Sequence, residues 1–332
     1  MAQVQLPQKV LEIADGIKTM RIRGAGKIAR AAAEALKIAA LEYAGPSDPT
    51  AFKKYMGRAA DVITNTRPTA VSLPNAVMYV MGALLRAEGS VDDLRAAVVS
   101  AADRFISESL EAVKKIAEYG SRRVPDNSVI LTHCHSTAAV SVIVEAYRRG
   151  KVVKVYSTET RPFYQGRITT RQLIENGVPV VQIPDSAVRG VIREVDQVII
   201  GADTVTSNGA VVNKIGTSQV ALIAHEARVR VFVAAETYKF SPITLVGELV
   251  PIEFRDPSEV VPKEWMERNK NVRVLNPAFD VTPPDYIDAI VTEVGVIPPQ
   301  AAIMVLLERL GWAFDQFKSI DIYRLRFEDL IE

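Results

Sequence analysis

From residue 128 onward, short apolar runs of strand length alternate with segments of helical periodicity, and this alternation constrains the fold most. Strands are expected over residues 128–132, 152–156, 178–183, 197–200 and 229–234. A helix over 137–149, which Gly150 closes, is one of those expected between them. Continuous apolar strands separated by helices are typical of a parallel sheet covered on both faces. This half is therefore predicted to be a Rossmann-like α/β domain with a doubly wound parallel sheet.

The first 120 residues follow a helical pattern instead. The apolar residues of 10–17 lie on one face of an amphipathic helix. Further helices are expected over 28–44, 50–64, 75–88 and 91–118, and no segment predicts a strand. Gly120 can take the left-handed conformation that ends a helix, and Pro125 marks a loop. We therefore expect a helical N-terminal domain over 1–120 and the Rossmann-like domain over 121–332.

The last helix is predicted from the residues at its two ends and from its apolar stripe. Pro298-Pro299 suits a helix start, and Gly311 suits a helix end. The residues expected to face inward are Ile303, Leu306, Leu307 and Leu310.

Charge and cysteine content exclude several classes of protein. Lys plus Arg number 40 and Asp plus Glu number 39, so no overall field favours nucleic acid or a membrane surface. The single cysteine, Cys134, cannot form an intramolecular disulfide, which excludes a stapled secreted scaffold. The uncharged stretch 68–85 is interrupted by Pro74 and Asn75, which favours a loop entering a buried helix over a membrane span. A soluble, cytoplasmic protein with local anion sites is expected.

Two candidate chemical groups follow strands of the predicted sheet. The strand 128–132 runs into His133, Cys134 and His135, and the strand 197–200 runs into Gly201-Ala202-Asp203. Ligands of open parallel sheets bind beyond the carboxyl ends of the strands. If both strands are central, Cys134 and Asp203 project from the same edge.

Cys134 has three interpretations from position alone. At the start of the helix 137–149, the helix dipole would lower the pKa of its thiol and favour the thiolate. It could equally be a small buried residue at a tight turn. A zinc site is disfavoured because no CxxC or HxxxH pair completes a tetrahedron. Asp203 could cap a helix or serve as a general acid or base. A thiolate and a carboxyl group together could open a sugar ring or move a proton between two carbons.

Several cationic or glycine-rich turns predict local phosphate binding. In Arg23-Gly24-Ala25-Gly26-Lys27, backbone N–H groups, a helix start and basic side chains could form an anion cradle. It matches neither a Walker motif nor a GxGxxG fingerprint. Other candidates are Arg67, Ser136, Thr137, Arg161, Gln165, Asn213, Lys214 and Lys239. Each alone could be a solvated surface group. Together, at turns on the strand-end side, they suit a small ligand with more than one phosphate.

A set of short motifs, in order along nearly the whole chain, resembles one superfamily. The motifs are Arg23-Gly-Ala-Gly26, Arg67-Pro-Thr-Ala70, Thr132-His-Cys-His-Ser136, Glu159-Thr-Arg-Pro162 with Gln165-Gly166, Gly201-Ala-Asp203, Asn213-Lys-Ile-Gly-Thr217 and Asn276-Pro-Ala-Phe-Asp280. The superfamily contains methylthioribose-1-phosphate isomerases, ribose-1,5-bisphosphate isomerases and the alpha, beta and delta regulatory subunits of translation initiation factor 2B. The resemblance implies the same division into a helical and a Rossmann-like domain.

Within the superfamily, the chain is most similar to the archaeal ribose-1,5-bisphosphate isomerases. The regulatory subunits usually lack the cysteine, whereas this chain has both Cys134 and Asp203. Methylthioribose-1-phosphate isomerases typically have RGAP and a cysteine followed by Asn-Ala-Gly, whereas this chain has RGAG and Cys134-His135-Ser136. The resemblance implies an aldose–ketose isomerase of archaeal AMP and nucleotide degradation. A methylthioribose-1-phosphate isomerase and a non-enzymatic regulatory subunit remain the alternatives.

The resemblance also implies roles for individual residues. It makes Cys134 the base that takes the C2 proton and Asp203 the acid that helps to open the sugar ring. It places around a sugar bisphosphate Arg23, Gly24, Ala25, Gly26, Arg67, Ser136, Thr137, Ala138, Asn213, Lys214 and Lys239. Arg161 and Gln165 are added from their position in a shared motif. No metal or cofactor is expected, and the family implies a homo-oligomer, either a dimer or a hexamer.

Overall fold

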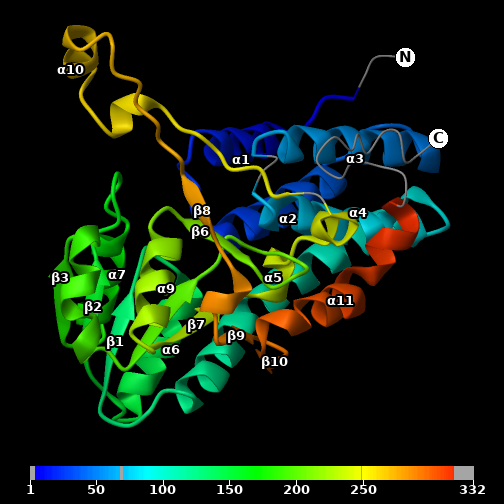
Figure 1. The fold of residues 1–332 in the computed structure, drawn as a ribbon. Coiled ribbons are helices and arrows are strands. Elements are labelled where there is room, and N and C mark those ends of the chain that lie inside the picture. Colours follow the sequence, from blue (N-terminus) through cyan, green and yellow to red (C-terminus); the bar gives the residue numbers. More distant parts are fainter. Residues whose placement is uncertain (1–3, 68–69, 248, 318–332) are drawn as a thin grey trace. The chain divides into compact units, whose positions relative to one another are not determined.

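A computed structural model describes residues 4–67, 70–247 and 249–317, and for residues 246 and 310–317 it describes the backbone alone. The chain forms two compact units (Figure 1). Unit 1 takes its described residues from 1–111, 238–243 and 307–332, and unit 2 takes its own from 112–237 and 244–306. The domain limits 1–120 and 121–332 stay a prediction.

Unit 1 is built from helices packed through small side chains. Its helices are α1 (Gln8–Lys18), α2 (Ala25–Leu41), α3 (Pro49–Thr64), α4 (Ser72–Arg86) and the first part of α5 (Val91–Arg122). The alanines of α2 that face the core, among them Ala29, Ala32 and Ala33, are fully buried. Their small side chains let α2 pack closely on α4. The expectation that residues 4–67 and 70–111 form no strand is confirmed.

Several helix ends differ from the sequence expectation, among them the ends of α2, α4 and α5. Helix α2 begins at Ala25 rather than at residue 28. Helix α5 runs through Gly120 to Arg122, so the expectation that Gly120 ends it is wrong. A Cβ on Gly120 would lie 2.7 Å from the Val142 side chain of α6. Gly120 therefore serves close helix packing, not a left-handed turn.

The apolar stretch in α4 is a buried helix, as expected. Its interrupting residues, Pro74 and Asn75, are themselves buried in unit 1. Within residues 4–67, 70–247 and 249–317, no helix is long and apolar enough to span a bilayer.

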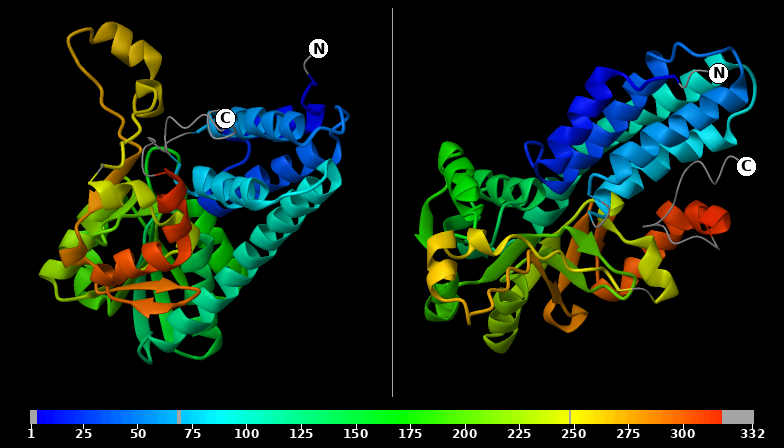
Figure 2. Two further views of the ribbon diagram at one scale, coloured as in Figure 1. Left: turned by 90° about the vertical axis from the view of Figure 1, so that its right-hand side faces the viewer. Right: turned by 90° about the horizontal axis from the view of Figure 1, so that it is seen from above.

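Unit 2 is organised around a seven-stranded sheet with the order β10-β9-β7-β4-β1-β2-β3. The strands are β1 (Ser128–Thr132), β2 (Val152–Thr158), β3 (Val180–Ile183), β4 (Gln197–Gly201), β7 (Arg230–Ala234), β9 (Ala289–Thr292) and β10 (Gly295–Ile297). All neighbours are parallel except β9 and β10, the orange hairpin at the sheet margin in Figure 2. The five strands expected from the sequence are confirmed, with small differences at their ends.

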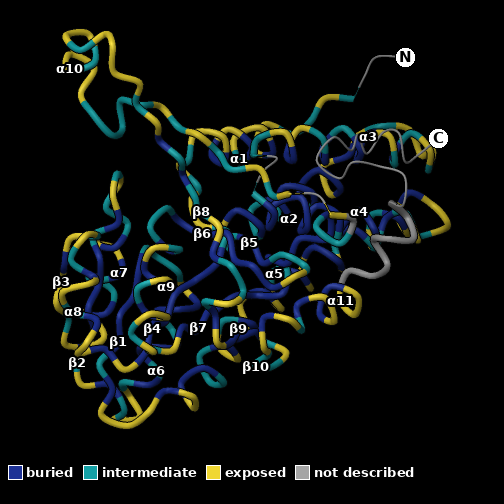
Figure 3. Tube along the Cα trace, in the orientation of Figure 1, coloured by how far each residue is buried: buried dark blue, intermediate teal, exposed yellow. Residues whose placement is uncertain are grey.

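Helices cover both faces of this sheet. They are α6 (Thr137–Arg148), α7 (Gly166–Glu175), α8 (Val188–Val191) and α9 (Thr217–Glu226). Successive residues of β4, which point to opposite faces, are all buried (Figure 3), for example Val198 and Ile199. The α/β, doubly wound architecture is confirmed.

A second, antiparallel sheet was not expected from the sequence. It joins β5 (Thr204–Val205), β6 (Val211–Lys214) and β8 (Phe279–Thr282) in the order β5-β6-β8. Between β6 and β8 in the chain, a mostly exposed arm holds α10 (Lys263–Arg268) (Figures 1 and 3). Short 3₁₀ helices complete the chain at Asp185–Ala187, Ile192–Glu194, Thr237–Lys239, Pro242–Val246, Pro257–Glu259, Pro284–Tyr286 and Pro299–Ala301.

The last helix departs from its predicted limits. Helix α11 (Ala302–Phe317) follows the Pro298-Pro299 start but continues past Gly311. Leu306 is buried as expected, whereas Ile303 is 40% and Leu307 is 52% exposed. The Leu310 side chain lies outside the described part of the chain. The prediction that the whole apolar stripe faces inward is therefore wrong for Ile303 and Leu307.

Candidate active site

Cys134 occupies the turn between β1 and α6 in a conformation that few side chains adopt. Its φ is 65°, in the left-handed region. Its backbone N–H donates to Thr160 Oγ1 at 2.9 Å, and its carbonyl accepts from Thr169 Oγ1 at 2.8 Å. Hydroxyl groups after β2 and in α7 thus hold the cysteine in this conformation. Backbone strain of this kind clusters at functional sites.

Asp203 follows β4, the direct parallel neighbour of β1 in the middle of the sheet. A Cβ at Gly201 would lie 2.3 Å from the Ser136 Cβ, so a glycine lets the end of β4 rest against the start of α6. The Asp203 N–H donates to the Val212 carbonyl at 3.0 Å. The expectation that Cys134 and Asp203 follow central strands at one sheet edge is confirmed.

Lys214 is a buried cation at the end of β6. Its Nζ donates to the Ala278 carbonyl at 2.9 Å and lies 4.6 Å from the centre of the Phe279 ring. Burial lowers the pKa of Lys214, and the nearby Arg255 guanidinium lowers it further. Arg255 lies 5.8 Å from the centre of the same ring. Sequence reasoning missed Arg255 because no local pattern around residue 255 predicts that this segment lies near Lys214.

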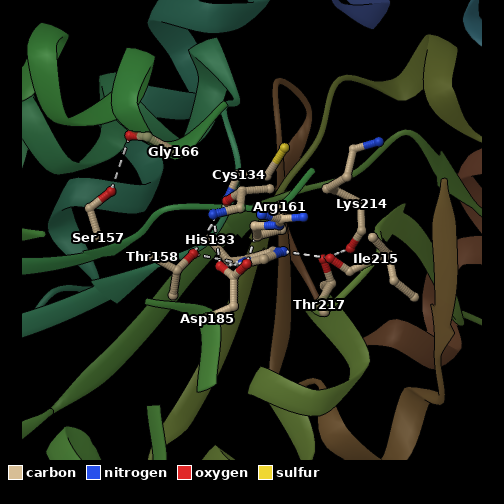
Figure 4. A network of polar contacts seen from close by, with 12 residues as sticks. His133, Cys134, Ser157, Thr158, Arg161, Gly166, Asp185, Lys214, Ile215 and Thr217 are labelled. Carbon is tan, nitrogen blue, oxygen red and sulfur yellow. Dashed lines mark hydrogen bonds and ion pairs between the residues drawn. The ribbon is translucent and has the colours of Figure 1, made fainter. Parts of the chain in front are cut away.

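Burial raises the pKa of the Cys134 thiol to about 12. The Lys214 charge lowers this pKa and the Asp203 charge raises it, so both groups lie near the sulfur. Figure 4 shows the Cys134 sulfur and the Lys214 nitrogen pointing to the same side. The expected lowering of the thiol pKa by the start of α6 is wrong, because removing the thiolate from water outweighs the helix dipole.

A carboxylate positions the loop that follows β2. Asp185 accepts from the backbone N–H of Thr160 at 2.7 Å and of Arg161 at 2.8 Å (Figure 4). Thr160 in turn accepts from Cys134. Asp185 therefore supports the cysteine turn through one intermediate residue, a role that its position after β3 did not reveal in the sequence.

The predicted binding residues around α6 have different surroundings. Ser136 caps α6, and its Oγ accepts from the Ala139 N–H at 3.3 Å. Thr137 is exposed and lines an open cavity of about 720 Å³ between α5, α6 and α7. Ala138 is fully buried. These three residues share the N-terminus of α6, which favours an anion.

The other predicted contacts of unit 2 have different partners. Arg161 donates to the Tyr164 hydroxyl at 3.0 Å and to the Val260 carbonyl at 3.1 Å. Gln165 stands at the start of α7, where its buried Oε1 accepts no hydrogen bond from the described residues. Asn213 donates to Thr217 Oγ1 at 3.0 Å.

In unit 1, the predicted residues Arg23, Gly24, Ala25 and Gly26 lie at the start of α2. Gly24 precedes α2 with a φ of 89°, which a glycine accepts without strain. The Ser72 hydroxyl donates to the Ala25 carbonyl at 3.1 Å, joining the start of α4 to the start of α2. Arg23 is exposed, and Gly26 is partly buried.

Lys239 and Arg67 lie in segments attached to the same end of α4. The Asn75 amide donates to the carbonyls of Tyr238 at 2.8 Å and Phe240 at 2.9 Å, on both sides of the buried Lys239. Arg67 is partly buried, and the next two residues of its motif, 68–69, lie outside the described residues. Asn75 was missed, although an amide inside an apolar helix is a signal for such a contact.

Across residues 4–67, 70–247 and 249–317, no group of three His, Cys, Asp or Glu side chains is arranged to hold a metal ion. The sheet edge brings together a thiol, a carboxyl group and a buried ammonium. Such a set can transfer protons and bind anions.

Comparisons with known proteins agree on one family. Residues 21–299 match the model of the Initiation factor 2 subunit family. The chain is 53% identical to the ribose 1,5-bisphosphate isomerase of Pyrococcus furiosus, over 92% of this chain and 96% of that protein. It is 37% identical to the methylthioribose-1-phosphate isomerase of Desulforudis audaxviator, over 90% of each. The solved structure of Pyrococcus horikoshii translation initiation factor eIF-2B matches with a TM-score of 0.76 at 33% identity, over 90% of this chain and 100% of that chain.

Proposed function

The chain belongs to the Initiation factor 2 subunit family, and from this premise we propose that it converts ribose 1,5-bisphosphate to ribulose 1,5-bisphosphate. One observation supports this proposal above the others. Cys134 and Asp203 follow adjacent central strands in a chain with high identity, over nearly its full length, to an archaeal enzyme named for that reaction. The proposal includes a cytoplasmic location and a homo-oligomeric state, dimer or hexamer.

The proposed reaction begins with opening of the sugar ring. A phosphate on C1 prevents the ring from opening as a free hemiacetal does. Asp203 therefore donates a proton to the ring oxygen as the bond from that oxygen to C1 breaks. Cys134 takes the proton from C2, and the electron pair of that bond forms the double bond between C1 and C2. The product of this step is an enol that bears the phosphate on C1.

The second half of the reaction forms the ketose. The C2 hydroxyl gives its proton to Asp203, and C2 becomes a carbonyl. The proton on Cys134 goes to C1, which becomes a methylene. Both residues return to their starting forms, so no redox cofactor takes part in the balance. Two groups that exchange proton roles in this way are typical of acid–base catalysis.

In this proposal, Lys214 is the cation that partly opposes the rise of the thiol pKa by burial. A thiol whose pKa is near 12 holds its proton at neutral pH, and only the thiolate can accept the C2 proton. The Lys214 ammonium is the group that favours the thiolate most strongly. We assign Lys214 the role of stabilising the charge of the thiolate and of the enol.

The phosphates are proposed to bind at cationic turns and helix starts. In unit 2 these groups are Ser136, Thr137, Ala138, Arg161, Gln165, Asn213 and Lys214. In unit 1 they are Arg23, Gly24, Ala25, Gly26, Arg67 and Lys239. Backbone N–H groups at a helix start and cationic side chains are the donors that phosphate prefers.

Phosphorus and carbon NMR of the purified protein tests the proposal directly. Ribose 1,5-bisphosphate and methylthioribose 1-phosphate are supplied separately, with Cys134→Ser as the control. A ketose formed only from the bisphosphate, and lost in the variant, is the expected result. A ketose formed only from the methylthio sugar would assign the protein to the other isomerase class.

Conversion of neither substrate would favour a non-enzymatic regulatory subunit, the third member of the superfamily. Asp203→Asn separates the acid role from simple binding. The variant is expected to lower kcat much more than it changes KM. A raised KM with a normal kcat would contradict the acid role of Asp203.

A further inference from the structure

The three histidines of the chain have very different surroundings. His225 is exposed on α9, and His135 is partly buried at the start of α6. His133 is 2% exposed at the end of β1, immediately before Cys134. A fully buried histidine beside a reactive group needs partners for both ring nitrogens, and the structure provides them.

The hydrogen bonds of His133 fix its tautomer. Nε2 lies 2.9 Å from the Ile215 carbonyl, which can only accept, so Nε2 carries the proton. Nδ1 lies 2.7 Å from Thr158 Oγ1, so in the neutral ring Nδ1 accepts from that hydroxyl. Burial lowers the pKa of His133, in agreement with a neutral ring.

The hydrogen bonds continue from His133 to the cysteine backbone. Thr158 Oγ1 lies 3.3 Å from Thr160 Oγ1, and Thr160 accepts from the Cys134 N–H. Because Thr158 donates to His133, Thr160 donates to Thr158. Each hydroxyl then has one defined donor direction, and the chain of bonds runs without conflict from Cys134 to Ile215 (Figure 4).

His133 thus joins the two segments that hold the proposed catalytic groups. Cys134 follows it directly, and Lys214 directly precedes its partner Ile215. The next residue, Gly216, has a φ of 99°, and a Cβ there would lie 3.0 Å from the His133 ring. The Gly216 N–H donates to Asp280 at 2.8 Å, which anchors the same turn from β8.

We propose that His133 is a positioning residue that holds the Cys134 turn and the Lys214 turn in register through its neutral ring. This rests on the proposed isomerase function for its consequence in turnover. The ring touches neither the sulfur nor the ammonium group in this role. It determines the positions of the two groups relative to each other. Because a small displacement of a catalytic group lowers the rate strongly, the loss of this connection should be measurable as a lower kcat.

The charged groups near the ring are compatible with this role. Asp185 Oδ1 lies 3.9 Å from Nδ1, and its charge favours a protonated ring. Lys214 has the opposite effect on the pKa of His133, and burial outweighs both. Protonation would make Nδ1 a second donor and reverse the bond from Thr158, so the neutral ring suits the observed geometry.

Two substitutions of His133 separate positioning from packing. His133→Gln keeps an N–H that can reach the Ile215 carbonyl, whereas His133→Leu keeps volume but has no donor. With ribose 1,5-bisphosphate, we expect His133→Leu to lower kcat about 10- to 100-fold with little change in KM. The kcat of His133→Gln should be much closer to that of the unsubstituted protein. His225→Gln, a change at an exposed histidine, is the matched control and should match the unsubstituted protein.

A second pair of variants keeps the histidine and tests the other end of the ring. Thr158→Val removes the hydroxyl that donates to Nδ1, and Thr158→Ser retains it. We expect Thr158→Val to lower kcat about tenfold and Thr158→Ser to stay near the unsubstituted rate. If His133→Leu does not fold, this pair of Thr158 variants still tests the positioning role of His133.

Alkylation of Cys134 reports, without any substrate, on the connection that His133 makes between the Cys134 turn and the Lys214 turn. The chain has one cysteine, so the rate of iodoacetamide labelling belongs to Cys134 alone. His133→Leu should label more slowly at fixed pH, because Lys214 is no longer held beside the sulfur. If the unsubstituted protein labels normally but converts no sugar, the isomerase proposal fails while positioning is still tested.

Three results would overturn the proposal. The first is a folded His133→Leu protein with unchanged kcat and labelling rate, since packing alone would then suffice. The second is a folded His133→Gln protein as inactive as His133→Leu, since the ring would then act by some other chemistry. The third is equal activity of Thr158→Val and Thr158→Ser at the unsubstituted rate.

Discussion

The cores of the two compact units differ in the types of side chain that they bury. The core of unit 1 is packed from alanine, other aliphatic, methionine and aromatic side chains, and its buried polar residues include Asn75 and Lys239. Unit 2 buries His133, Asn213, Lys214 and Glu236 near the carboxyl ends of its strands. Buried polar groups lower stability unless each one is paired. We therefore expect core substitutions in unit 1 to change mainly stability, and substitutions at the strand ends of unit 2 to change mainly turnover.

The largest expected effect is on turnover and comes from the sulfur itself. Cys134→Ser replaces the thiol with a hydroxyl that is a far weaker base at neutral pH. We expect turnover to fall by about a thousandfold or more, with an unchanged melting temperature. Steady-state kinetics and thermal melting measure the two quantities. Substantial remaining activity would remove Cys134 from the role of base.

A core substitution in unit 1 should produce the reverse pattern. Leu36 is fully buried in α2, so Leu36→Ala leaves a cavity in an apolar core. We expect a loss of about 3 kcal/mol in the free energy of unfolding, with kcat unchanged in the folded protein. Denaturant titration and kinetics below the melting point provide the measurements. A proportionate loss of kcat would show that the comparison between the units is too simple.

The pH dependence of Cys134 labelling tests the electrostatics of unit 2. Because burial raises the thiol pKa to about 12, the thiolate fraction increases with pH throughout the range below that value. The rate of iodoacetamide labelling should rise about tenfold per pH unit between roughly pH 8 and 10. Free cysteine, with a pKa of about 8.5, should approach a plateau in the same range. A plateau of the protein rate below pH 9 would contradict the burial argument.

The smallest expected effect concerns Asp280, which accepts from the Gly216 and Ser218 N–H groups. Burial raises the pKa of this carboxyl from 3.8 to about 6, so the folded protein binds the proton more tightly than the unfolded chain. Its contribution to stability is present below pH 3.8 and is lost as the pH rises through 6. The loss should be about 2 kcal/mol, since Asp280 is only partly buried.

Unfolding of the protein and of Asp280→Asn between pH 4 and 7 isolates this contribution. The difference in unfolding free energy between the two proteins should change in favour of the variant as the pH rises. A difference that is constant with pH would show that Asp280 titrates at its ordinary pKa.

Apolar patterning made much of the fold predictable from the sequence. The strands β1, β4 and β7 contain continuous apolar runs, and their alternation with helices is enough to predict Cys134 and Asp203 at one edge of the sheet. The β5-β6-β8 sheet was missed because β6 ends in Asn213 and Lys214, which are not typical of a strand. Its partner β8 comes only after the long arm that contains α10.

The surroundings of single residues could not be predicted in the same way. Sequence position suggested a helix dipole acting on Cys134, but burial determines the thiol pKa, and burial depends on every element packed around it. Gly120 is predicted to end a helix because its local sequence does not show that a side chain there would collide with Val142. Ile303 and Leu307 belong to an apolar stripe, yet the described residues leave them exposed.

The contact between Gly201 and Ser136 has a consequence for redesign. The space that a methyl group at 201 would need is filled by the Ser136 side chain, so the two positions share the volume of one side chain. Enlarging residue 201 requires a glycine at 136, which would remove the hydroxyl that caps α6 at the Ala139 N–H. Any change at the end of β4 is therefore also a change at the start of α6, and a protein engineer must treat the two positions as one.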